Sequence, residues 1–349
     1  MKVLMTGHRG YIGSVMGPIF ERAGHEVTGL DTGYFDPCLL GMEPETGIRY
    51  IRKDLRELEP DDLQGYDAVV HLAALSNDPI GNLNESWTRE INFEGSVRLA
   101  ELAKAAGVCR FLFSSSCIMY GISGLAVVNE DSPLDPKTEY ARSKVKAEEG
   151  IRRIASSTFW PVFLRNGTIY GFSPRMRFDT VLNDFVGRAA ATRRITVMGG
   201  GAPWRPVVHV EDVSRAFLAV LEAPREALRG EAYNLGTNDL NIQILRLAEI
   251  AAGQCDSCEL EVLHGEGTDQ RTYWTDFAKF ARTFPDFQFR WNPVTGATDL
   301  YTRLQRLGLR ANDFNDPRFT RLKWLNHLME THQLDQHLRW KTAAGVAVP

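Results

Sequence analysis

The chain has 349 residues, with 40 Lys and Arg against 44 Asp and Glu, for a formal net charge of -4. Dispersed basic residues and a slightly acidic balance give no positive field for a phosphate backbone, so we expect no nucleic-acid partner. No apolar run approaches the roughly 20 residues of a membrane-spanning helix. The first residues already have the pattern of a strand rather than a leader peptide, so we expect a cytoplasmic protein without a membrane segment.

Five cysteines are an odd number, which suits a reducing compartment better than a disulfide framework. Cys255 and Cys258 form one Cys-x-x-Cys pair, but no second pair of ligands accompanies it. A zinc site needs four ligands, so we expect two incidental thiols and no metal.

Short β-rich runs alternate with amphipathic stretches through the first half of the chain, which is typical of a doubly wound parallel sheet. The predicted strands are residues 2–5, 26–30, 48–51, 68–71, 111–114 and 162–164. Apolar residues recur at helical spacing between them, most clearly from residue 87 to residue 106. The first helix should begin near Tyr11, and Pro18 inside it predicts a kink or a widened turn.

The alternation loosens after about Tyr170 into loops, isolated helices and short strands. We therefore predict an α/β fold with a first domain over residues 1–170 and a smaller second domain over residues 171–349. A strand near residues 231–235 is expected to return to the main sheet. Apolar positions from residue 312 to residue 340 predict a docked helical extension at the C-terminus.

Three glycines, Gly7, Gly10 and Gly13, directly follow the first predicted strand and precede a helical pattern. Missing side chains at such a turn let the backbone approach a pyrophosphate, and the helix N-terminus points free N–H groups at it. Asp31 ends the second strand, where a carboxylate meets the ribose hydroxyls of a dinucleotide and repels a 2′-phosphate. The pattern favours NAD over NADP, and Arg9 is the residue that argues for the reverse.

Three further residues form an acid–base set. Tyr140 and Lys144 are four residues apart, which places phenol and ammonium on one helix face. A phenol with a pKa of about 10 is a poor base at neutral pH, but a nearby ammonium and a cationic nicotinamide both favour its phenolate. Tyr140 can then accept a hydroxyl proton as hydride leaves the carbon. Ser116, after the strand at 111–114, would hold the same oxygen by a hydrogen bond.

In this order, the motifs resemble the extended short-chain dehydrogenase/reductase family, in its NAD-dependent epimerase/dehydratase branch. The resemblance covers most of the chain to about Lys279 and includes residues 71–75, Asn92, residues 113–116, Tyr120-Gly121, Leu164-Arg165 and residues 169–171. It implies a Rossmann-type sheet with a smaller C-terminal substrate-binding domain. It also implies NAD as cofactor, a nucleotide-diphosphate sugar as substrate, and a homodimer formed through the helices of Asn92 and Tyr140.

The resemblance also implies a set of binding residues. Those for the cofactor are Gly7, Arg9, Gly10, Tyr11, Ile12, Gly13, Asp31, Asp54, Leu55, Leu72, Ala73, Ala74, Asn92, Ser114, Tyr140 and Lys144. Those for the substrate are Ser76, Ser116, Cys117, Thr168, Arg175, Arg205 and Arg271. Arg205 and Arg271 would anchor the diphosphate, because guanidinium groups bind such anions bidentately. Arg175 and Arg177 would reach a carboxylate or hydroxyls of the sugar.

Departures from the family pattern separate its reactions. The family's 4,6-dehydratases carry Asp and Glu directly after the catalytic Ser or Thr, whereas this chain has Cys117 and Ile118. A thiol can still donate a proton, but Ile118 has no titratable group, so the base for elimination is missing. Thr168 stands where the family usually has Asn before its Tyr-Gly pair, at the position that helps to hold the substrate's phosphates.

We therefore predict a nucleotide-sugar epimerase, acting at C4 by transient oxidation to a keto-sugar and re-reduction. The alternatives are a nucleotide-sugar reductase or dehydrogenase, which exchanges its dinucleotide at every turnover, and a 4,6-dehydratase. A non-catalytic nucleotide-binding sensor is a further alternative. The complete set of Ser116, Tyr140 and Lys144 argues against the sensor.

Overall fold

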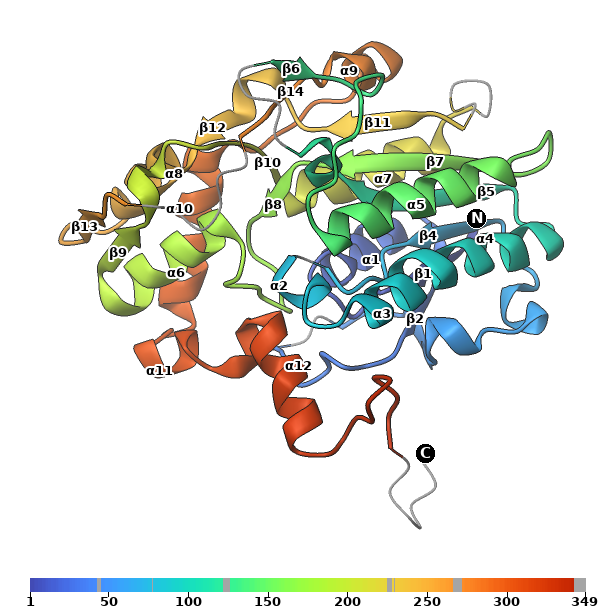
Figure 1. Ribbon diagram of the computed structural model, residues 1–349, viewed down its shortest axis with the longest axis horizontal. Helices are drawn as coiled ribbons and strands as arrows, with labels where there is room; N and C mark the ends of the chain where they lie inside the picture. The colour runs from blue at the N-terminus through green and yellow to red at the C-terminus, as the bar shows by residue number, and fades with distance from the viewer. Residues whose placement is uncertain are drawn as a thin grey trace.

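The computed structural model describes residues 1–42, 45–76, 78–121, 126–224, 228, 230–265 and 272–341 (Figure 1). Within these residues, seven parallel strands form the central sheet. In spatial order they are β11 (Ala232–Leu235), β7 (Trp160–Asn166), β5 (Arg110–Ser116), β4 (Ala68–His71), β1 (Lys2–Thr6), β2 (Glu26–Asp31) and β3 (Arg49–Arg52).

Helices cover both faces of this sheet, as the buried central positions of its strands require. On one face lie α1 (Gly13–Arg22) and α7 (Val210–Glu222), and on the other α4 (Gly95–Ala105) and α5 (Glu139–Arg153) (Figure 1). Alternate residues of β1 point to opposite faces of the sheet: Val3 packs with the first pair of helices, and Leu4 packs with the second. The predicted doubly wound, Rossmann-type α/β fold is confirmed.

The six predicted strands of the first half all form, each with ends within two residues of the expected ones. The strand expected near residues 231–235 also forms and pairs with β7. Helix α1 begins at Gly13 rather than near Tyr11, and it continues through Pro18 to Arg22.

The helical pattern expected from residue 87 to residue 106 is divided into three segments: α3 (Glu85–Thr88), a π-helical stretch η3 (Arg89–Glu94) and α4. Such π-helical stretches are frequent near functional sites.

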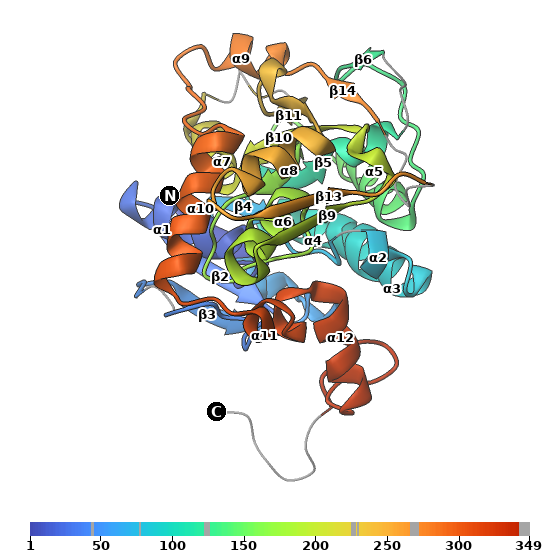
Figure 2. The ribbon, with the colours of Figure 1, turned by 90° about the vertical axis from the view of Figure 1, so that its left-hand side faces the viewer.

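The residues after Tyr170 build a second core beside the carboxyl end of the sheet, around Phe178, Val186 and Leu247 (Figure 2). Its larger elements are α6 (Val181–Thr192), β9 (Arg194–Val197), α8 (Ile244–Ala252), β13 (Glu259–Val262) and α10 (Pro293–Arg306). A small sheet connects it to the first part and consists of β8 (Thr168–Tyr170), β10 (Trp204–His209) and β12 (Asn241–Gln243). Strands β6 (Val127–Val128) and β14 (Trp274–Thr275) pair separately, with α9 (Ala278–Thr283) after them.

The C-terminal extension carries α11 (Ala311–Phe314), the short η8 (Pro317–Phe319) and α12 (Arg321–Glu330). It packs on the first half of the chain, where Leu325, Leu328 and Leu338 share an apolar cluster with Tyr34 and Trp87. Other short helices are η1 (Leu55–Glu57), η2 (Pro60–Leu63), α2 (Asp78–Gly81), η4 (Cys117–Tyr120), η5 (Gly199–Gly201) and η7 (Asn238–Leu240). Nowhere in the described part of the chain is a helix both long and apolar enough to span a bilayer.

A buried histidine connects β1, β4 and α4. His71 Nδ1 lies 2.7 Å from the hydroxyl of Thr6, and its Nε2 lies 2.8 Å from the hydroxyl of Ser96. Burial, with a smaller contribution from the charge of Lys144, lowers the pKa of His71 to about 3. The folded protein therefore keeps this ring neutral, whereas the unfolded chain protonates it below about pH 6.5.

This difference makes the cost of replacing His71 depend on pH. Because the folded pKa is depressed, the wild type loses stability as pH falls below about 6.5, by about 1.4 kcal/mol for this group at pH 5.5. A His71→Gln variant does not have this loss. The destabilisation caused by the substitution should be smaller at pH 5.5 than at pH 7.5 by that amount, measured by urea unfolding. An equal penalty at both pH values would show that His71 is protonated in the folded protein.

Candidate active site

A cavity of about 1620 Å³ lies along the carboxyl ends of β1, β2, β4, β5 and β7. This is the edge at which ligands bind in open α/β sheets. Pockets for one small ligand usually have about 300–1,000 Å³. The cavity is therefore large enough for two ligands, such as a dinucleotide and a nucleotide-activated sugar.

The glycine turn forms one wall with a backbone that excludes side chains. Gly7 has φ 73°, and a Cβ atom built on it would lie 2.7 Å from the Ala73 nitrogen. A Cβ atom on Gly13 would lie 2.3 Å from the Cα atom of His8. The turn thus brings bare backbone and the N-terminus of α1 to the cavity, which is the arrangement that fits a pyrophosphate.

Asp31 lines the cavity beside this turn. Its carboxylate accepts hydrogen bonds from the backbone nitrogens of Gly33 (2.9 Å) and Arg9 (3.2 Å). Burial raises the pKa of Asp31, and these two bonds oppose the rise. The side chain of Arg9 is instead turned to Asp36, with Nε 2.5 Å from Oδ1, and does not line the cavity. The site thus presents a carboxylate, and not this guanidinium, to a ribose.

Most of the expected cofactor residues lie around this part of the cavity. The lining includes Gly7, Gly10, Tyr11, Ile12, Asp31, Asp54, Leu55, Leu72, Ala73, Ala74, Ser114, Tyr140 and Lys144. Arg9, Gly13 and Asn92 are not part of it. Asn92 lies in the π-helical stretch behind the wall, where its amide binds both the nitrogen (2.8 Å) and the oxygen (3.0 Å) of Leu75. Its contacts hold the loop after β4 in place.

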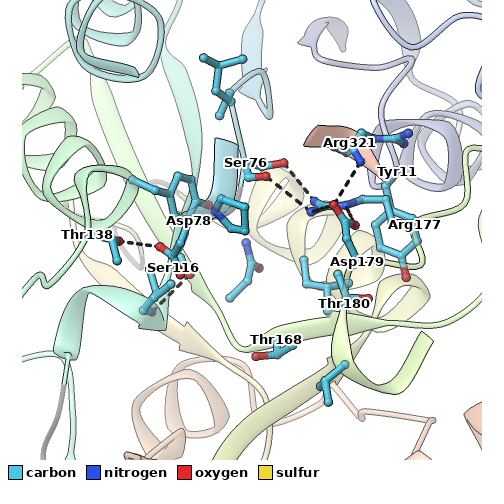
Figure 3. Close-up of a pocket in the computed structure, with 18 of the residues that line it drawn as sticks. Tyr11, Ser76, Asp78, Ser116, Thr138, Thr168, Arg177, Asp179, Thr180 and Arg321 are labelled. Carbon is cyan, nitrogen blue, oxygen red and sulfur yellow. Dashed lines mark hydrogen bonds and ion pairs between the residues drawn. The ribbon is translucent and has the colours of Figure 1, made fainter. Parts of the chain in front are cut away.

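The three expected reacting residues all line the cavity. Ser116 ends β5, and Tyr140 and Lys144 lie in the first two turns of α5, whose N-terminus is capped by Thr138 (Figure 3). The Lys144 ammonium donates to the carbonyl oxygen of Ser114 at 2.8 Å and lies 5.8 Å from the centre of the Tyr140 ring. The structure therefore brings the serine, the phenol and the ammonium together at one end of the sheet.

Burial acts in opposite directions on the phenol and the ammonium. It raises the pKa of Tyr140 above its usual range, whereas the charge of Arg177 lowers it and that of Asp78 raises it further. Burial lowers the pKa of Lys144 to about 7, opposed by the charge of Glu148. A phenolate in this cavity therefore needs additional positive charge nearby.

Among the expected substrate residues, Ser76, Ser116, Thr168 and Arg205 line the cavity, and Arg271 lies outside the described residues. The structure places Cys117 and Arg175 elsewhere, contrary to expectation. The thiol of Cys117 is buried in the core and donates to the Arg165 oxygen at 3.2 Å, and burial raises its pKa. Arg175 turns away from the cavity because its guanidinium donates to the carbonyl oxygens of Phe35 (2.8 Å) and Asp36.

Arg177 belongs to an ion-pair network on the wall opposite Ser116 (Figure 3). Its Nε lies 2.8 Å from Asp179 Oδ1, and one terminal nitrogen donates to the hydroxyl of Ser76 at 3.0 Å. Asp179 also accepts from the backbone nitrogen of Arg321 at 3.3 Å. Neither Asp179 nor Arg321 was predicted from the sequence as a site residue. Asp179 follows Arg177 by two residues, which is a usable signal, but nothing local points to Arg321 in the C-terminal extension.

A second missed group lies close to the reacting phenol. Asp78, on α2, lines the cavity and accepts a hydrogen bond from the hydroxyl of Thr138 at 2.5 Å. Helix α2 packs directly on Tyr140, since a Cβ atom on Gly81 would lie 2.9 Å from the Cβ atom of the tyrosine. This contact fixes the first turn of α5 at Tyr140 from outside that helix.

Comparison with known proteins agrees with this geometry. The model of the NAD dependent epimerase/dehydratase family matches residues 3–236, which is more than half of the chain. The chain belongs to this family. Its members are NAD-dependent enzymes that act on nucleotide sugars, and the glycine turn, helix N-terminus and Asp31 described above fit that cofactor.

Similar proteins catalyse two different reactions. A UDP-glucose 4-epimerase of Corynebacterium glutamicum is 28% identical over 68% of this chain and 76% of its own length. A dTDP-D-glucose 4,6-dehydratase of Mus musculus is 27% identical over 71% of each chain. The solved structure of MoeE5 in complex with UDP-glucose and NAD has a TM-score of 0.75 at 26% identity, covering 88% of this chain and 99% of that one. Overall similarity therefore fits both reactions, and individual residues must separate them.

Replacing Asp31 should change the choice of cofactor. An Asp31→Ala variant removes the carboxylate that repels a 2′-phosphate, so its preference for NAD over NADP should fall by about tenfold or more. Calorimetric titration of cofactor-stripped protein with NAD and with NADP gives the ratio of the two affinities. A wild type that already prefers NADP would contradict this role.

Replacing Lys144 should separate stability from activity. In the folded protein the pKa of Lys144 is about 7, below its usual value of 10.5. The free-energy cost of burying the ammonium therefore applies in full below pH 7 and falls as the pH rises toward 10.5. A Lys144→Met variant should have a melting temperature at least as high as that of the wild type at pH 6.5. Its gain in melting temperature over the wild type should be smaller at pH 9.5. Its turnover should fall by about a hundredfold.

Lys146→Met, an exposed position on the same helix, serves as the matched control and should change neither quantity. A Lys144→Met protein that melts well below the wild type at both pH values would contradict the expected cost of burying this lysine.

Proposed function

We propose that the protein is a nucleotide-sugar epimerase that inverts C4 by transient oxidation to a keto-sugar and re-reduction. The observation that carries the proposal concerns the two residues after Ser116. Ile118 lines the cavity, and the thiol of Cys117 is turned into the core and bonded to the Arg165 oxygen. The family's 4,6-dehydratases use an Asp and a Glu at these positions. This chain therefore has Ser116, Tyr140 and Lys144 for the oxidation step but lacks that acid–base pair.

The chain's own residues have distinct tasks in this reaction. Ser116 holds the C4 oxygen by a hydrogen bond, and Tyr140 takes the hydroxyl proton as the C4–H bond breaks. NAD, when bound, supplies the hydride acceptor and donor, and its positive ring charge favours the phenolate. After the keto-sugar has rotated so that its opposite face is reduced, Tyr140 returns the proton to the C4 oxygen. Oxidation and reduction balance within one cycle, so no net redox change occurs.

The diphosphate of the substrate is assigned to the part of the cavity near Arg205. This arginine lies on β10, lines the cavity and has its guanidinium carbon 5.8 Å from the centre of the Tyr273 ring. A guanidinium there can bind the anion while the sugar rotates. We also propose a homodimer formed through the helical stretches that carry Asn92 and Tyr140, which are η3 with the adjoining α4, and α5.

A panel of UDP- and dTDP-sugars, incubated with the protein in deuterated water and followed by NMR, tests the proposal. We expect interconversion of a pair of C4 epimers without deuterium at carbon, because the hydride that leaves also returns. Absorbance of reduced nicotinamide should stay flat. A Tyr140→Phe variant should turn over at least about a hundredfold more slowly, since it has lost the acid–base group.

Two other outcomes would assign a different reaction. Net formation or consumption of NADH would identify a dehydrogenase or reductase. Deuterium at C5 of a 6-deoxy-4-keto product would identify a dehydratase. Wild-type turnover by Tyr140→Phe would remove the phenol from the mechanism altogether.

A further inference from the structure

The loop that follows Asp31 is held from outside at four carbonyl groups, all within residues 32–36. The indole nitrogen of Trp340 donates to the oxygen of Thr32 at 2.7 Å, and that of Trp324 donates to the oxygen of Tyr34 at 2.7 Å. Arg175 binds the next two carbonyl groups, as described above. Since Thr32 and Tyr34 line the cavity at its ribose end, these bonds fix one bank of the dinucleotide site.

The opposite bank is formed by Lys53, Asp54 and Leu55, which also line the cavity. Arg56 next to them is paired with the Asp54 carboxylate at 2.7 Å. The same guanidinium donates to the carbonyl oxygen of His337 at 2.8 Å. The C-terminal extension therefore contacts this bank as well.

One short stretch of the extension joins the two banks. We call residues 334–341 the bridge segment; it follows α12 (Figure 1) and contacts residues that come after β2 and after β3. The carbonyl oxygen of Leu338 accepts from the phenol of Tyr34 on one bank and from Arg56, at 3.2 Å, on the other. Leu338 has φ 55°, a left-handed conformation that is unfavourable for leucine. The bonds to its carbonyl oppose that cost.

Side-chain contacts reinforce the same connection. Arg339 lies 2.6 Å from the carboxylate of Glu57 and 3.3 Å from that of Asp54. The guanidinium of Arg52 lies 4.8 Å from the centre of the Trp340 ring, where cation–π attraction applies. Charge, aromatic contact and hydrogen bonds thus connect the bridge segment to both banks.

The bridge segment has a fold of its own. The carboxylate of Asp335 accepts from the backbone nitrogens of His337 and Arg339, both at 2.8 Å, and Leu334 pairs with Trp340 in an antiparallel bridge. Leu334 and Leu338 are buried in the cluster that holds α12 against Ile80 and Trp87. The segment is therefore a rigid connection, because opening it breaks hydrogen bonds, an ion pair and apolar contacts together.

We propose that the bridge segment retains NAD by preventing the two banks from separating. Release of the adenosine end requires the loops after Asp31 and Lys53 to move apart, and the carbonyl group of Leu338 ties them to one point. A preorganised site of this kind loses its ligand slowly, because the walls cannot relax around it. The proposal depends on the dinucleotide site and not on which sugar reaction follows.

Exchange of bound NAD tests this without any sugar present. Full-length protein, loaded with NAD, is mixed with excess deuterated NAD, and mass spectrometry of the released dinucleotide gives the exchange rate. Trp340→Phe keeps the ring but loses the bond to Thr32, so exchange should be about fivefold faster than in the wild type. Asp335→Ala, which opens the bridge segment without touching the cavity, should exchange at least about tenfold faster.

Trp291→Phe is the matched control, since its indole stacks on His209 and neither residue lines the cavity. Wild-type exchange rates in both bridge variants would overturn the proposal, as would wild-type protein that exchanges its NAD within seconds. Equal acceleration in the control and in Trp340→Phe would show a general loss of stability and also overturn it. An altered sugar reaction with bridge-dependent exchange would instead refute only the proposed epimerase activity.

Discussion

Burial of a phenol and an ammonium in one wall is the constraint on which the site depends. In water the pKa values of Tyr and Lys are both about 10. Inside the cavity, loss of water raises the pKa of Tyr140 and lowers that of Lys144 to about 7. Forming a phenolate next to an ammonium in this wall therefore costs free energy unless another positive charge compensates. In the proposed reaction, the phenolate of Tyr140 would therefore depend on positive charge that a bound ligand brings into the site.

The surrounding structure serves to keep this pair in place without adding further charge. Asn92 fixes the loop after β4 through both backbone groups of Leu75, and Gly81 lets α2 pack against the backbone and Cβ atom of Tyr140. Arg177 lowers the pKa of the phenol, but its ion pair with Asp179 limits the field that it exerts. Position is thus secured by sterics and neutral hydrogen bonds, and the charges close to the phenol are largely balanced.

Features that depend on local spacing could be predicted from the sequence. Strands β1–β5 and β7, the glycine turn with Asp31, and the helix face shared by Tyr140 and Lys144 all follow from patterns that are local in the sequence. The direction of a side chain within a loop could not be predicted in this way. Arg175 was expected in the substrate pocket, but its partners are carbonyl groups about 140 residues earlier in the chain.

Other differences have the same physical origin. Cys117 follows Ser116 directly in sequence, yet the turn of η4 directs its thiol toward the Arg165 oxygen on β7. Arg321 reaches the cavity wall only because α12 docks on the first half of the chain. Contacts between distant segments select among side-chain directions that local pattern leaves open.

Distance along the chain also bears on how the cofactor site is completed. The two banks belong to the first 57 residues, and the bridge segment that joins them belongs to the last described ones. Contacts of such large sequence separation carry the entropy cost of closing a long loop, so they form late in folding. We therefore expect the dinucleotide site to be complete only after α12 has docked. An order of this kind couples the strength of cofactor binding to the integrity of the whole chain, including residues that never touch the reacting carbon.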